Sequence, residues 1–126
     1  MQSDRLIEYL WKMEDQPGFG NLAPVTVFSV SFLGDTPLHV AVRRGDIEIV
    51  AEMLEAGADI DAIGQDGFSA LHFAVMFDDV PIVLLLLENG ASISTMSDWD
   101  ESPLDSAARR GTKAIVEAIQ SKMTRS

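Results

Sequence analysis

Apolar and polar positions follow the same order three times along the chain. A hydroxyl residue, Thr36, Ser69 or Ser102, opens each copy, and the three lie at intervals of 33 residues. Behind each comes a short apolar stretch that closes on an alanine, then a turn, and then a second stretch with apolar residues every three or four positions. That spacing predicts two amphipathic helices in each copy. Self-similarity at a fixed period of this length indicates a repeat protein.

The first copy gives the clearest helix boundaries. Its first helix is expected over residues 37–44, because Pro37 lacks the N–H that a first-turn position would leave unpaired. The second helix is expected between a cap at Asp46 and a stop at Gly57. The corresponding caps in the other two copies are Asp79 and Thr112.

The residues before the first copy follow a different pattern. Residues 1–15 carry one apolar face at helical spacing and predict a capping helix. Residues 16–33 contain glycine, proline and a β-branched run, which predict a loop and an extended β-finger. The rest of this single domain divides into repeat 1 at 34–66, repeat 2 at 67–99, and repeat 3 with a C-terminal cap at 100–126.

These motifs resemble the ankyrin repeat family. Residues 34–41 (GDTPLHVA), 45–50 (GDIEIV) and 54–62 (LEAGADIDA) follow the family pattern closely, and the likeness continues in three copies to about residue 119. The resemblance implies a β-turn and two antiparallel helices in each repeat, with neighbours stacked because one helix pair cannot bury its apolar face alone. The predicted fold is therefore an all-α ankyrin-repeat solenoid, with three repeats, an N-terminal capping helix and an extended first β-finger.

Three aspartates depart from the family pattern. Asp78 replaces the glycine between the two helices of its copy, so it is expected to tolerate a positive φ or a strained conformation. Asp100 replaces a turn glycine. Asp105 replaces the histidine that the other copies have at His39 and His72, and weaker local hydrogen bonding is expected there.

Composition and charge narrow the function further. The chain contains no cysteine, which excludes disulfides and thiolate chemistry. Its apolar runs are far shorter than the roughly 20 residues that cross a bilayer, and no secretion signal opens it, so we expect a soluble, cytoplasmic protein. The formal net charge of −11 disfavours nucleic acid and membrane partners and favours a basic protein. Solubility alone also explains this charge.

The residues that suggest catalytic or metal chemistry have a structural interpretation too. In the family, the histidine found here at His39 and His72 stabilises the turn and the adjacent repeat. Ser69 and His72 are a possible nucleophile and base, but the sequence suggests no third group to orient them. The acidic residues around Trp99 lack the spacing and glycine of a calcium loop, which favours a solvated turn or a contact surface. We therefore expect no enzyme activity, metal or cofactor.

The resemblance also implies a protein-binding surface on the turn tips and on the exposed face of each first helix. The three copies contribute Phe32, Leu33, Asp35, Arg43 and Arg44; Gln65, Asp66, Phe68, Met76 and Phe77; and Asp98, Trp99, Glu101, Arg109 and Arg110. We interpret Phe68, Met76, Phe77 and Trp99 as a central anchor cluster with acidic residues at its rim. The alternative is that these four side chains pack against their own neighbouring loops.

These observations favour a non-catalytic protein–protein interaction module that is monomeric when unbound. One hypothesis is an acidic inhibitor of a basic effector or toxin, since the sequence is similar to small stand-alone ankyrin proteins of bacteria, some of which are immunity proteins. The other is a general adaptor or scaffold. The sequence leaves open which is right, and whether residues 16–31 contact the partner.

Overall fold

The computed structural model describes residues 35–110 and 113–125. The predicted capping helix at 1–15, the loop and β-finger at 16–33 and the predicted cap Thr112 lie outside these residues.

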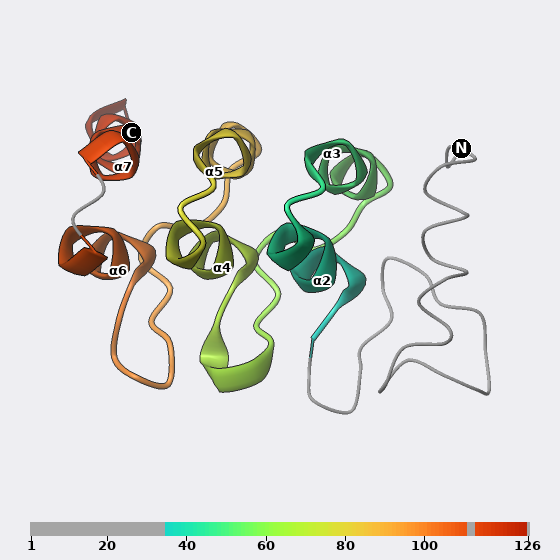
Figure 1. Cartoon of the computed structure of the whole chain (residues 1–126), viewed down its shortest axis with the longest axis horizontal. Coiled ribbons are helices and arrows are strands. Elements are labelled where there is room, and N and C mark those ends of the chain that lie inside the picture. Colours follow the sequence, from blue (N-terminus) through green and yellow to red (C-terminus); the bar gives the residue numbers. More distant parts are fainter. Residues whose placement is uncertain (1–34, 111–112, 126) are drawn as a thin grey trace.

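Three helix pairs make up the described part. The first helices are α2 (Pro37–Arg44), α4 (Ala70–Met76) and α6 (Pro103–Arg110), and the second helices are α3 (Ile47–Glu55), α5 (Val80–Glu88) and α7 (Lys113–Arg125). A short 3₁₀ helix, η1 (Gln65–Gly67), lies in the loop before α4. The first helices form one row, the second helices form a row above it, and long loops extend below the first row (Figure 1). The described residues contain no strand, so the predicted all-α class is confirmed for them.

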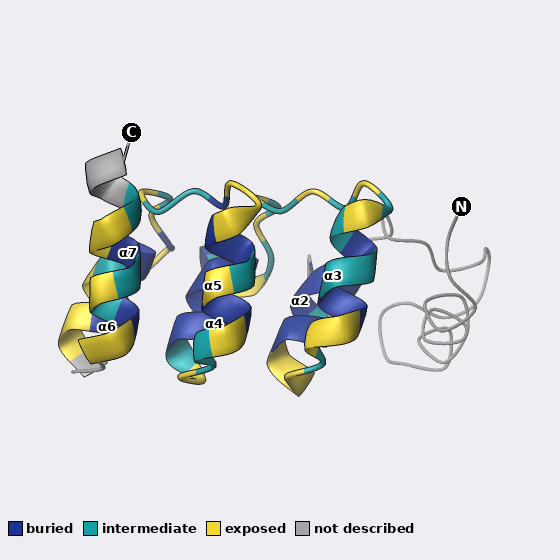
Figure 2. Cartoon of the chain, turned by 90° about the horizontal axis from the view of Figure 1, so that it is seen from above, coloured by how far each residue is buried: buried dark blue, intermediate teal, exposed yellow. Residues whose placement is uncertain are grey.

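Apolar side chains between the two rows form the core. Each helix has a buried face turned towards its neighbours and an exposed face on the other side (Figure 2). The largest fully buried apolar side chains are Leu38, Ile49, Met53, Leu71, Ile82, Leu86, Ile115 and Ile119. Full burial of such a side chain contributes about 1.5–3 kcal/mol. Because the cluster runs through all three helix pairs, most of this stabilisation depends on the stacking of repeats.

The hydroxyl residue that opens each of the first two repeats caps its first helix. The Thr36 side chain accepts a hydrogen bond from the backbone N–H of His39, and the His39 ring accepts one from the backbone N–H of Thr36. Ser69 and His72 form the same reciprocal pair at the start of α4. Each pair satisfies backbone donors that the first turn of a helix leaves without partners.

The predicted caps of the second helices behave differently from one another. Asp79 accepts a hydrogen bond from the Ile82 N–H at 3.2 Å, as expected. Asp46 occupies the predicted N-cap position directly before α3, but its side chain makes no cap hydrogen bond. Its φ and ψ of −92° and 78° nearly match the −91° and 84° of Asp79, so the difference lies in the direction of the side chain.

The aspartates that replace glycines adopt the backbone conformation that glycine favours. Asp78 has a φ of 56°, close to the 73° of Gly45 at the equivalent turn, which confirms the prediction. Asp100 has a φ of 58°, and its equivalent Gly67 has 73°. Aspartate tolerates this region better than most residues because its short polar side chain forms local hydrogen bonds.

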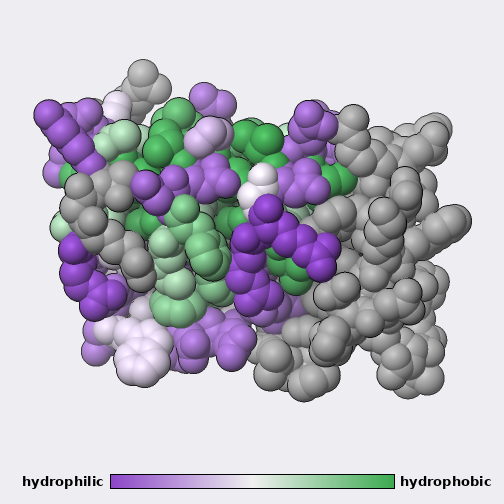
Figure 3. Space-filling model, in the orientation of Figure 1, coloured by the Kyte–Doolittle hydropathy of each residue, from purple (hydrophilic) through white to green (hydrophobic). Residues whose placement is uncertain are grey.

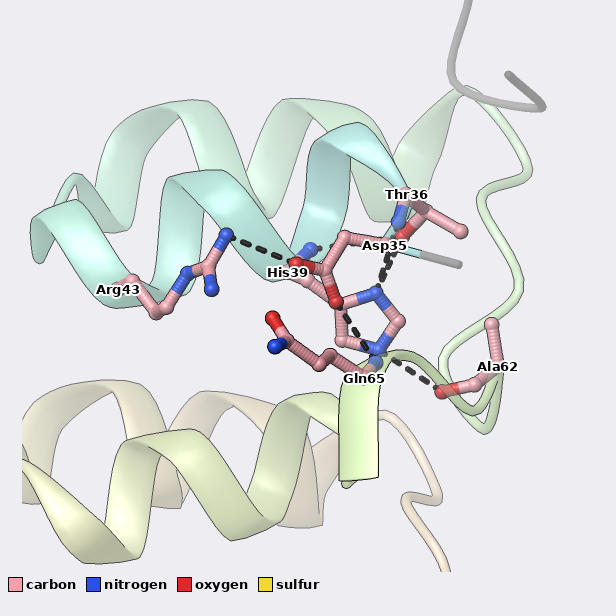
Figure 4. A network of polar contacts seen from close by, with 6 residues as sticks. All are labelled: Asp35, Thr36, His39, Arg43, Ala62 and Gln65. Carbon is pink, nitrogen blue, oxygen red and sulfur yellow. Dashed lines mark hydrogen bonds and ion pairs between the residues drawn. The ribbon is translucent and has the colours of Figure 1, made fainter. Parts of the chain in front are cut away.

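His39 also connects its repeat to the next loop (Figure 4). Its Nδ1 accepts the Thr36 N–H at 2.9 Å, and its Nε2 lies 3.0 Å from the carbonyl oxygen of Ala62. Because Nδ1 is an acceptor, the proton of the neutral ring is on Nε2, which donates to Ala62. One imidazole therefore caps a helix and holds the following loop.

The third repeat keeps the cap and lacks the connection. His72 accepts the Ser69 N–H at 3.1 Å and bonds the Glu101 carbonyl oxygen at 2.9 Å. Asp105 accepts the Ser102 N–H at 3.0 Å and donates its own N–H to the Ser102 hydroxyl at 3.1 Å. The expectation of weaker local bonding at Asp105 was wrong, because a carboxylate oxygen takes the place of Nδ1. Asp105 has no second group equivalent to Nε2.

Candidate protein-binding surface

Two of the predicted surface residues in the first repeat form an ion pair, in which Asp35 is buried and Arg43 remains exposed (Figure 4). Asp35 is only 3% exposed, its Oδ1 accepts the Gln65 N–H at 3.0 Å, and its Oδ2 lies 3.0 Å from Arg43 Nη2. The Arg43 guanidinium also lies 5.1 Å from the centroid of the Phe73 ring. Much of the charge of Asp35 and Arg43 is therefore compensated within the molecule.

The third repeat has an ion pair at the equivalent positions. Glu101 Oε1 lies 3.0 Å from Arg109 Nη1, and Glu101 Oε2 accepts the Ser106 hydroxyl at 3.1 Å. Glu101 and Arg109 each follow their counterparts Asp35 and Arg43 by 66 residues, which is two repeats.

The middle repeat replaces this ion pair with two apolar residues, Phe68 and Met76. Both are half-buried and pack against the core. The Phe68 ring centroid lies 5.6 Å from that of Phe73 and 5.6 Å from that of His72. Figure 3 shows hydrophobic surface between hydrophilic areas over the described helices. We call Phe68, Met76 and the adjacent Phe77 the central apolar strip.

Phe77 and Trp99 are the most exposed of the four predicted anchors. Phe77 is 56% exposed at the C-terminal end of α4, and Trp99 is 68% exposed at the tip of the α5–α6 loop. The Asp98 N–H at this tip donates a hydrogen bond to the Asp66 carbonyl oxygen at 3.0 Å. Asp66 lies in the preceding loop, just before the start of α4. The two aromatic side chains thus lie near opposite ends of α4, which is about 10 Å long at 1.5 Å per residue.

In the loops, two exposed apolar residues were missed from the sequence. Ile63 is 47% exposed and Met96 is 52% exposed, one repeat apart in consecutive loops. The available signal was an apolar residue at the same loop position in two copies, where the core pattern does not require one. With Trp99 they form what we call the loop-tip row.

The loop tips carry negative charge that no described basic side chain pairs with. Asp66, Asp98 and Asp100 are exposed, and no described basic side chain lies within ion-pair distance of them. Of the remaining predicted residues, Arg44 and Gln65 are exposed, and Arg110 ends α6. Phe32 and Leu33 lie outside the described residues.

The Ser69–His72 pair has the distance of a nucleophile and its base, with 2.9 Å between Oγ and Nδ1. Both residues are buried, at 2% and 0% exposure, and His72 Nε2 is occupied by the Glu101 carbonyl. Burial lowers the pKa of both the His72 and the His39 imidazoles, against the opposing effect of their carbonyl partners. A substrate would have no access to Ser69, so the pair is suited to capping a helix.

The described residues show no group of histidine and acidic side chains arranged to hold a metal ion. Within the same residues, no helix is both long and apolar enough to span a membrane.

Stacked helix pairs joined by long loops define a solenoid repeat protein. The model of the ankyrin repeat family matches residues 4–97 and 38–124, with three copies. The chain therefore belongs to the ankyrin repeat family, whose members generally act as protein–protein interaction modules. No curated protein matches it.

Proposed function

We propose that this chain is a non-catalytic module that binds a basic protein through the central apolar strip and the loops beside it. The observation that carries the proposal is the replacement, in the middle repeat alone, of the ion pair of its neighbours by Phe68 and Met76. Apolar residues surrounded by polar ones are the usual arrangement at the centre of an interface. Phe77 extends the strip into solvent, where the fold itself gains little from a large aromatic side chain.

The preference for a basic partner follows from the charges on the same side of the molecule. Arg43 and Arg109 are paired with Asp35 and Glu101, so they compensate little of the surrounding negative charge. Asp66, Asp98 and Asp100 have no such partner among the described residues. A positively charged protein would be attracted and oriented by this field.

Within this proposal, the chain acts as an inhibitor that occupies the functional surface of a basic effector or toxin. Apolar anchors within an acidic field suit the blocking of a cationic site. The alternative is an adaptor or scaffold that presents the same surface to several proteins, and the family membership is equally compatible with it.

The test uses the purified chain as bait in an extract of cells that encode it, with two matched variants. Phe77→Ala removes an anchor that is 56% exposed. Leu84→Ala removes an apolar side chain that is 44% exposed on α5, in the row of second helices. A partner retained by wild type and Leu84→Ala but weakened by about 2 kcal/mol with Phe77→Ala supports the proposed surface. Equal binding by all three proteins would contradict it.

A second measurement separates the inhibitor from the adaptor. A dedicated inhibitor abolishes the activity of one basic partner at one equivalent, and its affinity falls as salt is raised. Several unrelated partners with unchanged activities would favour the adaptor. Binding that does not respond to salt would remove the electrostatic preference for a basic partner.

A further inference from the structure

The loop-tip row presents apolar side chains beyond the core of the repeats. Ile63 and Met96 occupy equivalent positions in consecutive loops and are about half exposed. Trp99 is 68% exposed, the highest value among the large apolar residues of the described part. Ile63 lies in the loop before α4, Met96 and Trp99 lie in the loop before α6, and a hydrogen bond joins these two loops. Exposed apolar side chains on neighbouring loops require an explanation other than packing within the chain.

The backbone that carries Trp99 is fixed by hydrogen bonds. Ser97 Oγ accepts the Trp99 N–H at 3.1 Å, and the Ser97 carbonyl oxygen accepts the Asp100 N–H at 3.0 Å. The Asp98 N–H reaches the Asp66 carbonyl oxygen of the preceding loop at 3.0 Å. The tip is therefore held in place before binding, which reduces the entropy lost when a partner docks.

The charge beside this row determines what kind of segment it fits. Asp98 and Asp100 flank Trp99 in the chain, and Asp66 lies on the neighbouring loop bonded to it. None of the three has a basic partner in the described part of the chain. An indole face attracts cations, and carboxylates nearby increase that attraction.

We propose that the loop-tip row docks a basic segment of the partner protein, with an arginine or lysine side chain lying across the Trp99 indole. Ile63 and Met96 contact the methylene groups of that side chain or an apolar residue next to it in the segment. Arginine and lysine both bury their methylene groups along apolar surface. The inference rests on the proposed protein-binding function, and it adds the chemical identity of the segment that is recognised.

The test is a selection of peptides from a displayed library of short random sequences on the immobilised chain. The selected peptides are expected to combine arginine or lysine with apolar residues. Trp99→Ala is expected to weaken their binding by about tenfold or more, and Leu84→Ala to leave it unchanged. Because Trp99 and Leu84 are both exposed, neither change should lower the thermal unfolding midpoint appreciably.

Two further variants distinguish a cation contact from a simple apolar one. Trp99→Phe keeps an aromatic face and should retain more affinity for the selected basic peptides than Trp99→Leu. Asp98→Asn keeps the shape of the loop and should flatten the dependence of affinity on salt. Equal losses in Trp99→Phe and Trp99→Leu, with unchanged salt dependence in Asp98→Asn, would overturn the cation assignment.

The remaining outcomes separate this inference from the function on which it rests. Acidic or uncharged peptides that need Trp99 would overturn the basic segment and leave protein binding intact. Basic peptides that need Phe77 and not Trp99 would overturn the loop-tip site alone. Peptides insensitive to both substitutions would contradict the proposed function as well.

Discussion

The first helices of the second and third repeats begin with the same cap, built with different chemistry. In the second repeat His72 caps α4 and also bonds the Glu101 carbonyl in the next loop. In the third, Asp105 makes the same cap with Ser102 and reaches no further. Capping a helix needs one acceptor, which a carboxylate supplies as well as an imidazole. Joining two repeats needs a side chain with functional groups at both ends.

The largest expected effect on stability comes from removing the His72 side chain, which bonds both Ser69 and the next loop. His72→Ala loses hydrogen bonds to the Ser69 N–H, the Ser69 hydroxyl and the Glu101 carbonyl, and leaves a cavity at a fully buried position. We expect a loss of about 3 kcal/mol in the free energy of unfolding, measured with urea. Asp105→Ala removes an exposed residue that only caps, so its loss should be clearly smaller.

His72→Asn sharpens the same comparison. The amide oxygen can accept the Ser69 N–H, but the shorter side chain does not replace Nε2 at the Glu101 carbonyl. Its stability should lie between wild type and His72→Ala. If His72→Ala and Asp105→Ala cost the same, the connection between repeats contributes nothing beyond the cap.

The next largest effect on stability is expected where the α3–α4 loop approaches the α5–α6 loop. A Cβ added at Gly67 would lie 2.7 Å from the Asp98 backbone nitrogen, in addition to the strain of a φ of 73°. Gly90 has a similar φ of 86° and no heavy atom within 4 Å of an added Cβ. We expect Gly67→Ala to cost about 2 kcal/mol and Gly90→Ala about 1 kcal/mol by thermal unfolding. Equal losses would show that backbone strain alone explains both glycines.

The repeat period predicted the backbone better than the surface. It placed the first helix at residues 37–44, as observed, because periodic apolar residues, a hydroxyl cap and a glycine stop all agree there. Asp46 and Asp79 occupy equivalent N-cap positions with similar backbone angles, yet only the Asp79 side chain makes a cap hydrogen bond. The repeat spacing predicts the position of a cap and does not determine the rotamer of its side chain.

The candidate surface was harder to predict because its charges depend on contacts in three dimensions. Asp35 and Arg43 were predicted as exposed binding residues, and the structure places them in an ion pair with Asp35 buried. Ile63 and Met96 were missed because loop positions carry no periodic signal that marks an apolar residue as exposed. The binding surface therefore stays a prediction, and contacts between the described side chains determine which of its charges are paired.

A smaller effect is expected in the pH dependence of stability, which differs between the two repeats that contain His39 and His72 and the repeat that contains Asp105. Burial lowers the pKa of His72 and of His39, where Asp35 opposes the shift and Arg43 adds to it. The unfolded chain then binds more protons below pH 6.5, so this stability is present above about pH 6.5 and is lost as the pH falls towards the lowered values. The slope is at most about 1.4 kcal/mol per pH unit for each histidine.

Asp105 responds in a more acidic range. The Ser102 N–H lowers the pKa of this carboxyl group, so its contribution is present above about pH 3.8 and is lost only as the pH falls below that. Urea unfolding at several pH values, together with NMR titration of the two imidazoles, checks both ranges. A pKa of 6.5 or above for either histidine in the folded protein would contradict the prediction.

The smallest expected effect compares equivalent positions in the second helices. Glu52 in α3 has a buried carboxylate oxygen, Oε2, with no hydrogen-bond partner in the described structure, whereas the equivalent Leu85 in α5 packs against the core. A buried polar atom without a partner costs about 1–3 kcal/mol, partly recovered by movement of the side chain. We therefore expect Glu52→Leu to raise the free energy of unfolding by about 1 kcal/mol. Glu52→Gln, which keeps the polar group, is the matched control, and a gain equal to that of leucine would assign the effect to charge rather than to the unpaired oxygen.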